Sequence, residues 1–234
     1  ETEERIEDLI PQGAIDAATR LVLTNAIYFN AAWQSSFNED LTKDGAFYLL
    51  DGEQVTVPMM KQTESFGYTE GEGCQAVELR YDGGELSMVI LLPEPGNFED
   101  FEESLQAQEI DDIIDELHSA QVTLTMPKFE FESKFSLKDT LSEMGMPVAF
   151  SGGADFSGMT GAPDLFIDEV LHKAFVSVDE AGTEAAAATA VIMKESAMPA
   201  QQVDVTIDRP FIFLIRDIET EAVLFLGHVL NPAA

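Results

Sequence analysis

The residue types that most often carry out catalysis or bind metals are few in this sequence and lie far apart. Cys74 is the only cysteine of the 234 residues, so no disulfide can form within the chain and four-cysteine zinc sites are excluded. The histidines, His118, His172 and His228, show no HExxH or HxxxH spacing. Serine, histidine and aspartate are present, but no GxSxG nucleophile elbow supports a hydrolase. We therefore expect no enzyme activity, no cofactor and no metal.

The segment DEAGTEAAAATAVIMKESAMPAQQ, residues 179–202, points to a different chemistry. It has no apolar face of helical or strand period and is typical of an exposed loop, and loops of this length in compact domains are usually either functional or disordered. Its alanines favour a helix over 184–189 as the alternative. Small residues at Thr183, Ala185 and Ala187 would also let the segment enter a packed sheet as a new strand without overpacking.

The composition limits the possible partners. With 12 Lys plus Arg against 44 Asp plus Glu, the formal charge is −32, whereas 45% apolar residues are enough for a folded core. Such a surface repels phosphate backbones and anionic lipids, so we expect neither nucleic acid nor membrane partners. The acidic side chains repel one another at low salt, which indicates a halophilic protein. We interpret the acidic surface as an adaptation to a salty environment rather than as a binding patch for a basic partner.

Hydrophobic patterning predicts a mixed α and β protein in which strands dominate, organised as a single domain over 1–234 without repeats or linkers. Residues 19–29 are predicted to be a central strand covered on both faces, and 210–229 a buried apolar hairpin. Asp82-Gly83-Gly84 predicts a hairpin turn. One or two helices are expected over 98–118, and a short helix over 136–144 ends at Gly145. Further strands are predicted at 55–58, 76–80, 86–93, 121–131 and 165–178. No apolar run is long enough for a membrane span, and the given sequence does not open with the basic n-region and apolar h-region that are typical of a signal peptide.

Seven motifs in this order resemble those of the serpin family, the serine protease inhibitor superfamily. They are NAIYF (25–29) with Trp33, VPMM (57–60), LSMVILLP (86–93), MPKF (126–129), ADFSG (154–158), the stretch 180–189, and DRPF (208–211) continuing through LFLG (224–227) to Asn231-Pro232. The resemblance implies an α+β serpin fold, with several sheets and surrounding helices. It covers the C-terminal two thirds of that fold, so the N-terminal helical region and the first two strands of the main sheet are expected to be missing. We expect that remainder in the same or a separate chain, and we favour a fragment.

The resemblance also implies a function. A serpin is a suicide-substrate inhibitor: the target serine protease is acylated by the reactive-centre loop, here about 180–202, and is trapped when the cleaved loop inserts into the main sheet. A non-inhibitory serpin, or a truncated fragment without inhibitory activity, is the alternative. We favour an extracellular location over a cytoplasmic one, although the true N-terminus is not visible.

Site residues are carried over by the same resemblance. The proximal hinge comprises Glu180, Gly182, Thr183, Glu184, Ala185, Ala186, Ala187, Ala188 and Thr189, and its small residues fit the inhibitory pattern. Counting seventeen residues from Glu180 puts the scissile bond between Ser196 and Ala197, which favours subtilisin-like or elastase-like proteases. A different register within about 193–198 would favour a glutamyl-specific protease at Glu195 or a trypsin-like one at Lys194.

Two further regions are implied by the family. Asn25 and His172 match the shutter beneath the opening sheet, where a hydrogen bond is expected, although a histidine in an apolar strand can equally be an ordinary core residue. Trp33 and Lys128 match the breach, where the loop first enters the sheet. Lys128 is expected to pair with Glu180, whereas Trp33 can equally be part of the core.

Overall fold

The computed structural model describes residues 6, 9–13, 15–17, 19–71, 73–183 and 202–233. Its contacts divide the chain into two compact units. The small unit contains residues 1–29 and 131–176, and the large unit contains 30–130 and 177–234. The single domain expected over 1–234 stays a prediction.

The small unit is organised around two parallel strands. Strand β1 (Leu21–Tyr28) pairs with β9 (Ile167–Val178), whose last two residues belong to the large unit. Strand β8 (Phe129–Ser136) also pairs with β9. Three short helices follow β8: α3 (Lys138–Glu143), the 3-10 helix η2 (Pro147–Phe150) and α4 (Ser157–Thr160). Gly145, with φ +109°, follows α3 as predicted, because the left-handed backbone that ends a helix favours glycine.

The prediction that 19–29 forms a central strand covered on both faces is wrong. Strand β1 is the last strand of its sheet among the described residues, and its middle residues are exposed, with Leu23 at 42%. A short apolar run identifies a strand, but it does not reveal which neighbours will cover it.

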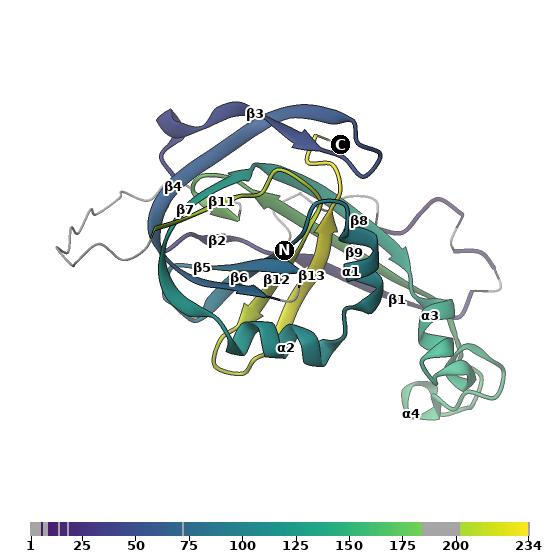
Figure 1. Ribbon diagram of the computed structural model, residues 1–234. Helices are drawn as coiled ribbons and strands as arrows, with labels where there is room; N and C mark the ends of the chain where they lie inside the picture. The colour runs from purple at the N-terminus through teal and green to yellow at the C-terminus, as the bar shows by residue number, and fades with distance from the viewer. Residues whose placement is uncertain are drawn as a thin grey trace. The chain divides into compact units, whose positions relative to one another are not determined.

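The large unit contains a sheet of eight strands (Figure 1). Their order is β11 (Gln202–Thr206), β7 (His118–Pro127), β4 (Gln54–Gly71), β5 (Cys74–Arg80), β6 (Leu86–Pro93), β12 (Phe211–Asp217) and β13 (Val223–Val229), with β3 (Lys43–Tyr48) beside β4. All of these pairs are antiparallel except β11 with β7. Gly83 and Gly84, with φ of +88° and +73°, form the predicted turn between β5 and β6.

Two helices cover part of this sheet, as the helical period of 98–118 predicts. Helices α1 (Phe98–Ser104) and α2 (Ala107–Asp115) lie over strands β6, β12 and β13 in Figure 1. Their apolar side chains pack on a core formed by Ala76, Val89, Leu91, Phe98, Ile212 and Leu214. The acidic residues between these apolar positions are left to solvent.

The predicted C-terminal hairpin is present, but only one of its strands is buried. The apolar side chains of β12 are buried between β6 and β13, whereas β13 ends the sheet of the described residues. Val223, Leu224 and Leu226 are 51%, 44% and 59% exposed. The expectation that the whole hairpin is buried is therefore wrong, because hydrophobic composition does not distinguish an edge strand from an inner one.

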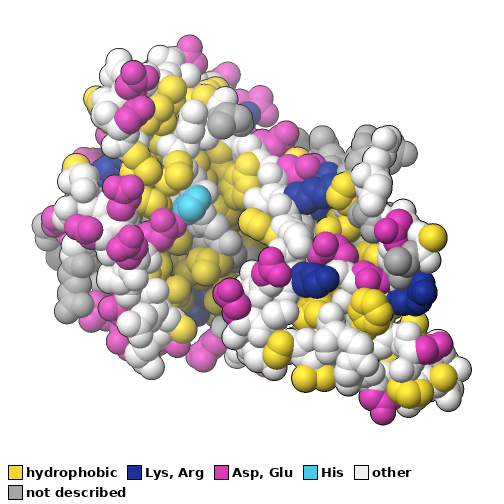
Figure 2. Space-filling model, turned by 90° about the vertical axis from the view of Figure 1, so that its right-hand side faces the viewer, with side chains coloured by type: hydrophobic (Ala, Val, Ile, Leu, Met, Phe, Trp, Pro, Cys, Tyr) yellow, Lys and Arg dark blue, Asp and Glu magenta, His cyan; other side chains and the backbone are white. Residues whose placement is uncertain are grey.

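The surface reflects the composition. On the face shown in Figure 2, acidic side chains are spread among hydrophobic ones, and basic side chains form only a few patches. The inference of a salty environment stays a prediction. Within the described ranges, no helix is both long and apolar enough to cross a membrane.

Candidate functional site

The candidate site lies in the large unit, where the chain leaves β9 and begins the predicted loop. Asp179 follows β9 and forms a tight turn: its Oδ1 accepts hydrogen bonds from the backbone N–H groups of Ala181 (2.8 Å) and Gly182 (3.2 Å). Its own N–H donates to the Gly182 carbonyl at 2.9 Å. An aspartate at the start of a turn commonly bonds the backbone two or three residues on, so this side chain fixes the direction of the loop start.

The first loop residues already form a strand. Strand β10 (Gly182–Thr183) pairs antiparallel with β2 (Ala31–Ala32). Thr183 pairs in addition with Val178 at the end of β9. The start of the loop therefore lies between two other strands, with a backbone partner on each side.

The close approach of β2 explains the glycine at 182. A Cβ atom at this position would lie 2.2 Å from the Ala31 carbonyl oxygen and 2.7 Å from the Ala32 Cα. These are backbone atoms, which cannot move aside as the end of a flexible side chain would. Glycine is therefore required by the packing of β10 on β2.

Thr183 is anchored by Tyr81, a residue that sequence reasoning did not connect with the loop. Its hydroxyl shares a 2.8 Å hydrogen bond with that of Tyr81, and neither residue is exposed. The Tyr81 ring stacks on Trp33, with centroids 4.6 Å apart and planes inclined by 11°. Burial raises the pKa of Tyr81, and the bond to Thr183 offsets only part of that rise, so its hydroxyl stays protonated.

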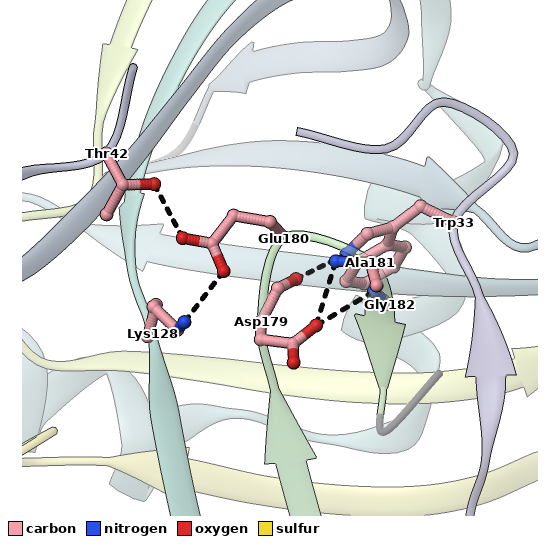
Figure 3. Close-up of polar contacts among 7 residues, drawn as sticks. All are labelled: Trp33, Thr42, Lys128, Asp179, Glu180, Ala181 and Gly182. Carbon is pink, nitrogen blue, oxygen red and sulfur yellow. Dashed lines mark hydrogen bonds and ion pairs between the residues drawn. The ribbon is translucent and has the colours of Figure 1, made fainter. Parts of the chain in front are cut away.

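Glu180 is held by a cation and a hydroxyl (Figure 3). Lys128 Nζ donates to Oε2 at 2.7 Å, as predicted, and the Thr42 hydroxyl donates to Oε1 at 2.6 Å. Glu180 is 7% exposed. Burial by itself raises the pKa of this carboxyl group, but the bonds from Lys128, Thr42 and its own backbone N–H outweigh burial and lower the pKa below 4.5. Glu180 is therefore a buried, paired carboxylate.

Trp33 and Phe37 hold the backbone of the same turn. The indole Nε1 of Trp33 donates to the Asp179 carbonyl and its backbone N–H donates to the Ala181 carbonyl, both at 2.9 Å. The Phe37 N–H donates to the Glu180 carbonyl at 2.9 Å. Trp33, which is 3% exposed, is thus a core residue that also bonds the loop start, so its two interpretations do not exclude each other.

Asn25 and His172 lie in the small unit, where β1 and β9 pair them directly as register partners. His172 is half-buried and stacks on Phe135, with ring centroids 6.4 Å apart. The predicted hydrogen bond between the Asn25 and His172 side chains, and their function as a shutter, stay predictions. Asn25 and His172 are neighbours because they are opposite each other in the parallel strands β1 and β9.

The remaining predicted residues are outside the described part of the chain. These are Glu184, Ala185, Ala186, Ala187, Ala188 and Thr189 of the hinge, and Ser196 and Ala197 at the predicted scissile bond. The residues that sequence reasoning missed are Thr42, Tyr81 and Asp179. Asp179 could have been identified from the sequence, because an aspartate that directly follows a predicted strand and precedes a glycine by three residues is typical of a turn. No local pattern distinguished Thr42 or Tyr81.

Outside this site, metal binding and thiol chemistry depend on how the described His, Cys, Asp and Glu side chains are placed. In the ranges that the structure describes, no three His, Cys, Asp or Glu side chains gather closely enough to hold a metal ion. Burial raises the pKa of Cys74 to about 11, so its thiol stays protonated and unreactive at neutral pH.

Comparisons with known proteins agree with this architecture. A family model described as "Serpin (serine protease inhibitor)" matches residues 1–232. A serpin-like protein of Thermococcus kodakarensis is 44% identical over 99% of this chain and 54% of its own length. Leukocyte elastase inhibitor of Sus scrofa is 42% identical over 99% of this chain and 64% of its own. The crystal structure of human thyroxine-binding globulin superposes with a TM-score of 0.88 and 32% identity, over 99% of this chain and 61% of that one. The chain thus spans between about half and two thirds of the length of these proteins.

Proposed function

The chain belongs to the serpin family, and on that premise we propose that it inhibits serine proteases as a suicide substrate. In this reaction the serine oxygen of the protease attacks the carbonyl carbon of Ser196. The bond to Ala197 breaks, and the new amine leaves with a proton. The protease remains as an ester on Ser196 until water hydrolyses it, and inhibition requires that this hydrolysis be stalled.

The observation that carries the proposal is the buried start of the loop. Gly182 and Thr183 already pair with β2, and Thr183 pairs with β9 as well. Continuing this strand requires residues small enough to enter a packed sheet, and 184–189 reads EAAAAT. After cleavage the loop can extend the pairing beyond Thr183 and satisfy its backbone groups within the sheet. That gain is the free energy available to carry the acylated protease along.

The anchoring side chains support the same proposal by fixing where insertion starts. Lys128 and Trp33 are proposed to act as the breach, because both bond the turn from which the loop departs. Asn25 and His172 are proposed to act as the shutter between β1 and β9, which must adjust when a strand is added. The names of the relatives agree with an inhibitory function, since one of them is an elastase inhibitor.

The proposed target is a protease with a shallow first pocket, subtilisin-like or elastase-like. Ser196 is too small to fill a deep pocket and carries no charge to pair within it. Cleavage after Glu195 or Lys194 would instead indicate a glutamyl-specific or a trypsin-like target.

A second candidate is a non-inhibitory serpin that binds a small molecule. The likeness to thyroxine-binding globulin, whose crystal structure contains a thyroid hormone, favours this alternative. Thermal melting of the protein before and after loop cleavage distinguishes the two. An inhibitor gains a large increase in melting temperature on cleavage, because its loop becomes a strand. Cleavage without that increase would count against loop insertion and favour the binding protein.

A further inference from the structure

A cavity of about 440 Å³ lies in the large unit, between the end of the hairpin formed by β4 and β5 and the helices α1 and α2. Its volume is within the range that small-molecule sites usually have. Side chains of Cys74, Phe101, Leu105 and Ile113 contribute apolar surface to its walls. The described residues that line it include none of those that hold the start of the predicted loop. The cavity is therefore separate from the candidate functional site.

The register of the hairpin shows how the cavity stays open. Gly71 is opposite Cys74 and Thr69 is opposite Ala76, so the side chains of these two pairs are on one face of the sheet. Ala76 belongs to the core on which α1 and α2 pack, so this is the face toward the helices. A Cβ atom at Gly71 would meet no other atom within 4 Å. The space beside Gly71 is thus part of the cavity.

The hydroxyl of Thr69 is a polar group on the sheet side of the cavity. Thr69 is 8% exposed. Within the described ranges, its side chain has no hydrogen-bond partner. Most buried hydroxyl groups in proteins have such a partner, because burial without one costs free energy. This hydroxyl can therefore form a hydrogen bond with a ligand in the cavity.

The helix side of the cavity carries charge of one sign. The described lining contains no Lys, Arg or His, and its acidic residues are Glu109, Asp112, Asp115 and Glu116. All four are exposed, and none makes an ion pair in the part of the chain that the structure describes. Asp115 ends α2 and Glu116 follows it, where the last carbonyl groups of the helix add negative potential. Acids are common throughout this chain, but here they adjoin an apolar wall and an unpaired hydroxyl.

We propose that this cavity binds a small organic cation with an apolar body, a protonated amine at one end and a hydroxyl group at the other. The apolar body packs on the side chains of α1 and α2, which removes its surface from water. The ammonium group lies among the carboxylates at the end of α2, and the hydroxyl bonds Thr69. The proposal does not depend on the inhibitory function, because the cavity is separate from the loop start.

The test uses three probes of nearly equal size. Para-(aminobutyl)phenol carries both polar ends, phenylbutylamine lacks the hydroxyl, and para-(hydroxyphenyl)butanoate replaces the amine by a carboxylate. Each is titrated into the full-length protein by isothermal calorimetry, at moderate and at high salt. We expect para-(aminobutyl)phenol to bind at least about tenfold more tightly than the butanoate at moderate salt. That ratio should shrink as salt rises, because salt screens the exposed carboxylates.

Two variants test the sheet side of the cavity. Thr69→Val keeps the shape of the side chain and removes the hydroxyl, so it should weaken para-(aminobutyl)phenol about fivefold and leave phenylbutylamine unchanged. Gly71→Leu should fill the cavity and abolish binding of both amines. Its backbone does not have a positive φ, so leucine is compatible with the fold. Equal effects of Thr69→Val on the two amines, or full binding by Gly71→Leu, would overturn the proposal.

A matched pair of charge variants tests the helix side. D115N/E116Q removes two charges from the cavity, whereas E85Q/E130Q removes two from exposed positions of the same unit outside its lining. We expect the first to weaken both amines about tenfold and the second less than twofold. D115N/E116Q should fold normally, because the end of a helix disfavours negative charge. Equal losses in both variants, equal affinity for all three probes, or no binding of para-(aminobutyl)phenol by the wild type would each overturn the site.

Discussion

Tyr81 and Thr183 are joined by a 2.8 Å hydrogen bond between their hydroxyl groups, and both residues are fully buried. Tyr81 follows β5, whereas Thr183 is the second residue of the two-residue strand β10. The bond therefore ties the start of the predicted loop to the large unit's sheet, next to the stacked ring of Trp33. It makes the Thr183 side chain part of the buried core.

Replacing Tyr81 by phenylalanine should weaken this anchor while keeping the stacking. Tyr81→Phe leaves the buried Thr183 hydroxyl without this partner, which costs about 1–3 kcal/mol in the free energy of unfolding. Urea denaturation followed by tryptophan fluorescence measures the change. Tyr48→Phe is the control, because Tyr48 is 49% exposed and should change stability very little. Equal effects of the two variants would mean that the hydrogen bond does not stabilise the fold.

Gly182→Ala should disturb the loop start more directly. Its Cβ would meet the Ala31 carbonyl oxygen at 2.2 Å, so β10 and β2 must separate, at a cost of roughly 1–3 kcal/mol. We expect lower stability and a smaller fraction of protease trapped per cleavage. Gly158→Ala is the matched control, since no atom lies within 4 Å of its Cβ position. A Gly182→Ala protein that traps as well as wild type would contradict the pairing of β10 with β2.

The carboxylate of Glu180 should make stability depend on pH in the acidic range. Because its pKa in the folded protein lies below 4.5, the ionised form stabilises the fold at neutral pH. That contribution is lost as the pH falls from 4.5 through the lower pKa of the folded state. Glu180→Gln should therefore be less stable than wild type at pH 7, by about 1–3 kcal/mol. The difference should shrink below pH 4.5.

Thermal or urea denaturation from pH 7 down to pH 3 measures this difference. Glu53→Gln, at an exposed position of the same unit, controls for the loss of one negative charge. A constant difference between Glu180→Gln and wild type across the whole pH range would refute the assignment.

The ion pair between Lys173 and Glu132 should respond unequally to the loss of either partner. The Lys173 side chain is 6% exposed, the Glu132 side chain is 45% exposed, and their charged atoms are 2.8 Å apart. Glu132→Gln leaves a buried ammonium without its carboxylate, whereas Lys173→Met leaves a carboxylate that water can solvate. We expect Glu132→Gln to cost about 1–3 kcal/mol, because the pair is only partly buried, and Lys173→Met clearly less. Urea denaturation measures both losses of unfolding free energy. A larger loss for Lys173→Met than for Glu132→Gln would contradict the idea that the buried ammonium group of Lys173 depends on its carboxylate partner.

Much of the fold follows from local patterns in the sequence. Short runs of β-type residues located β5 and β6, the helical period located α1 and α2, and Gly83-Gly84 located the turn. The predicted strand over 121–131 is in fact two strands, β7 and β8, separated at Lys128. The short strands β2 and β10 were missed, because two residues carry no period and form only where distant segments meet. The same reason explains why the sequence did not show that β1 and β13 end their sheets.

Part of the candidate site could be predicted, namely the contacts between residues that family motifs identify. The pairing of Lys128 with Glu180 was expected from the family resemblance and is present at 2.7 Å. Thr42 and Tyr81 were not predicted, because each reaches the loop start from a segment far away in the sequence, 138 and 102 residues from its partner. No local signal encodes such a contact. It appears only when the strands are placed side by side.

The central claim is that a protease which cleaves this loop is trapped by it. The most direct measurement combines the full-length protein with subtilisin-like, elastase-like and trypsin-like proteases in molar salt, followed by boiling, denaturing electrophoresis and mass analysis. We predict a band at the summed mass of inhibitor and protease that survives boiling, together with a released C-terminal peptide that begins at Ala197. Complete cleavage of the loop by every protease without such a band would contradict the claim.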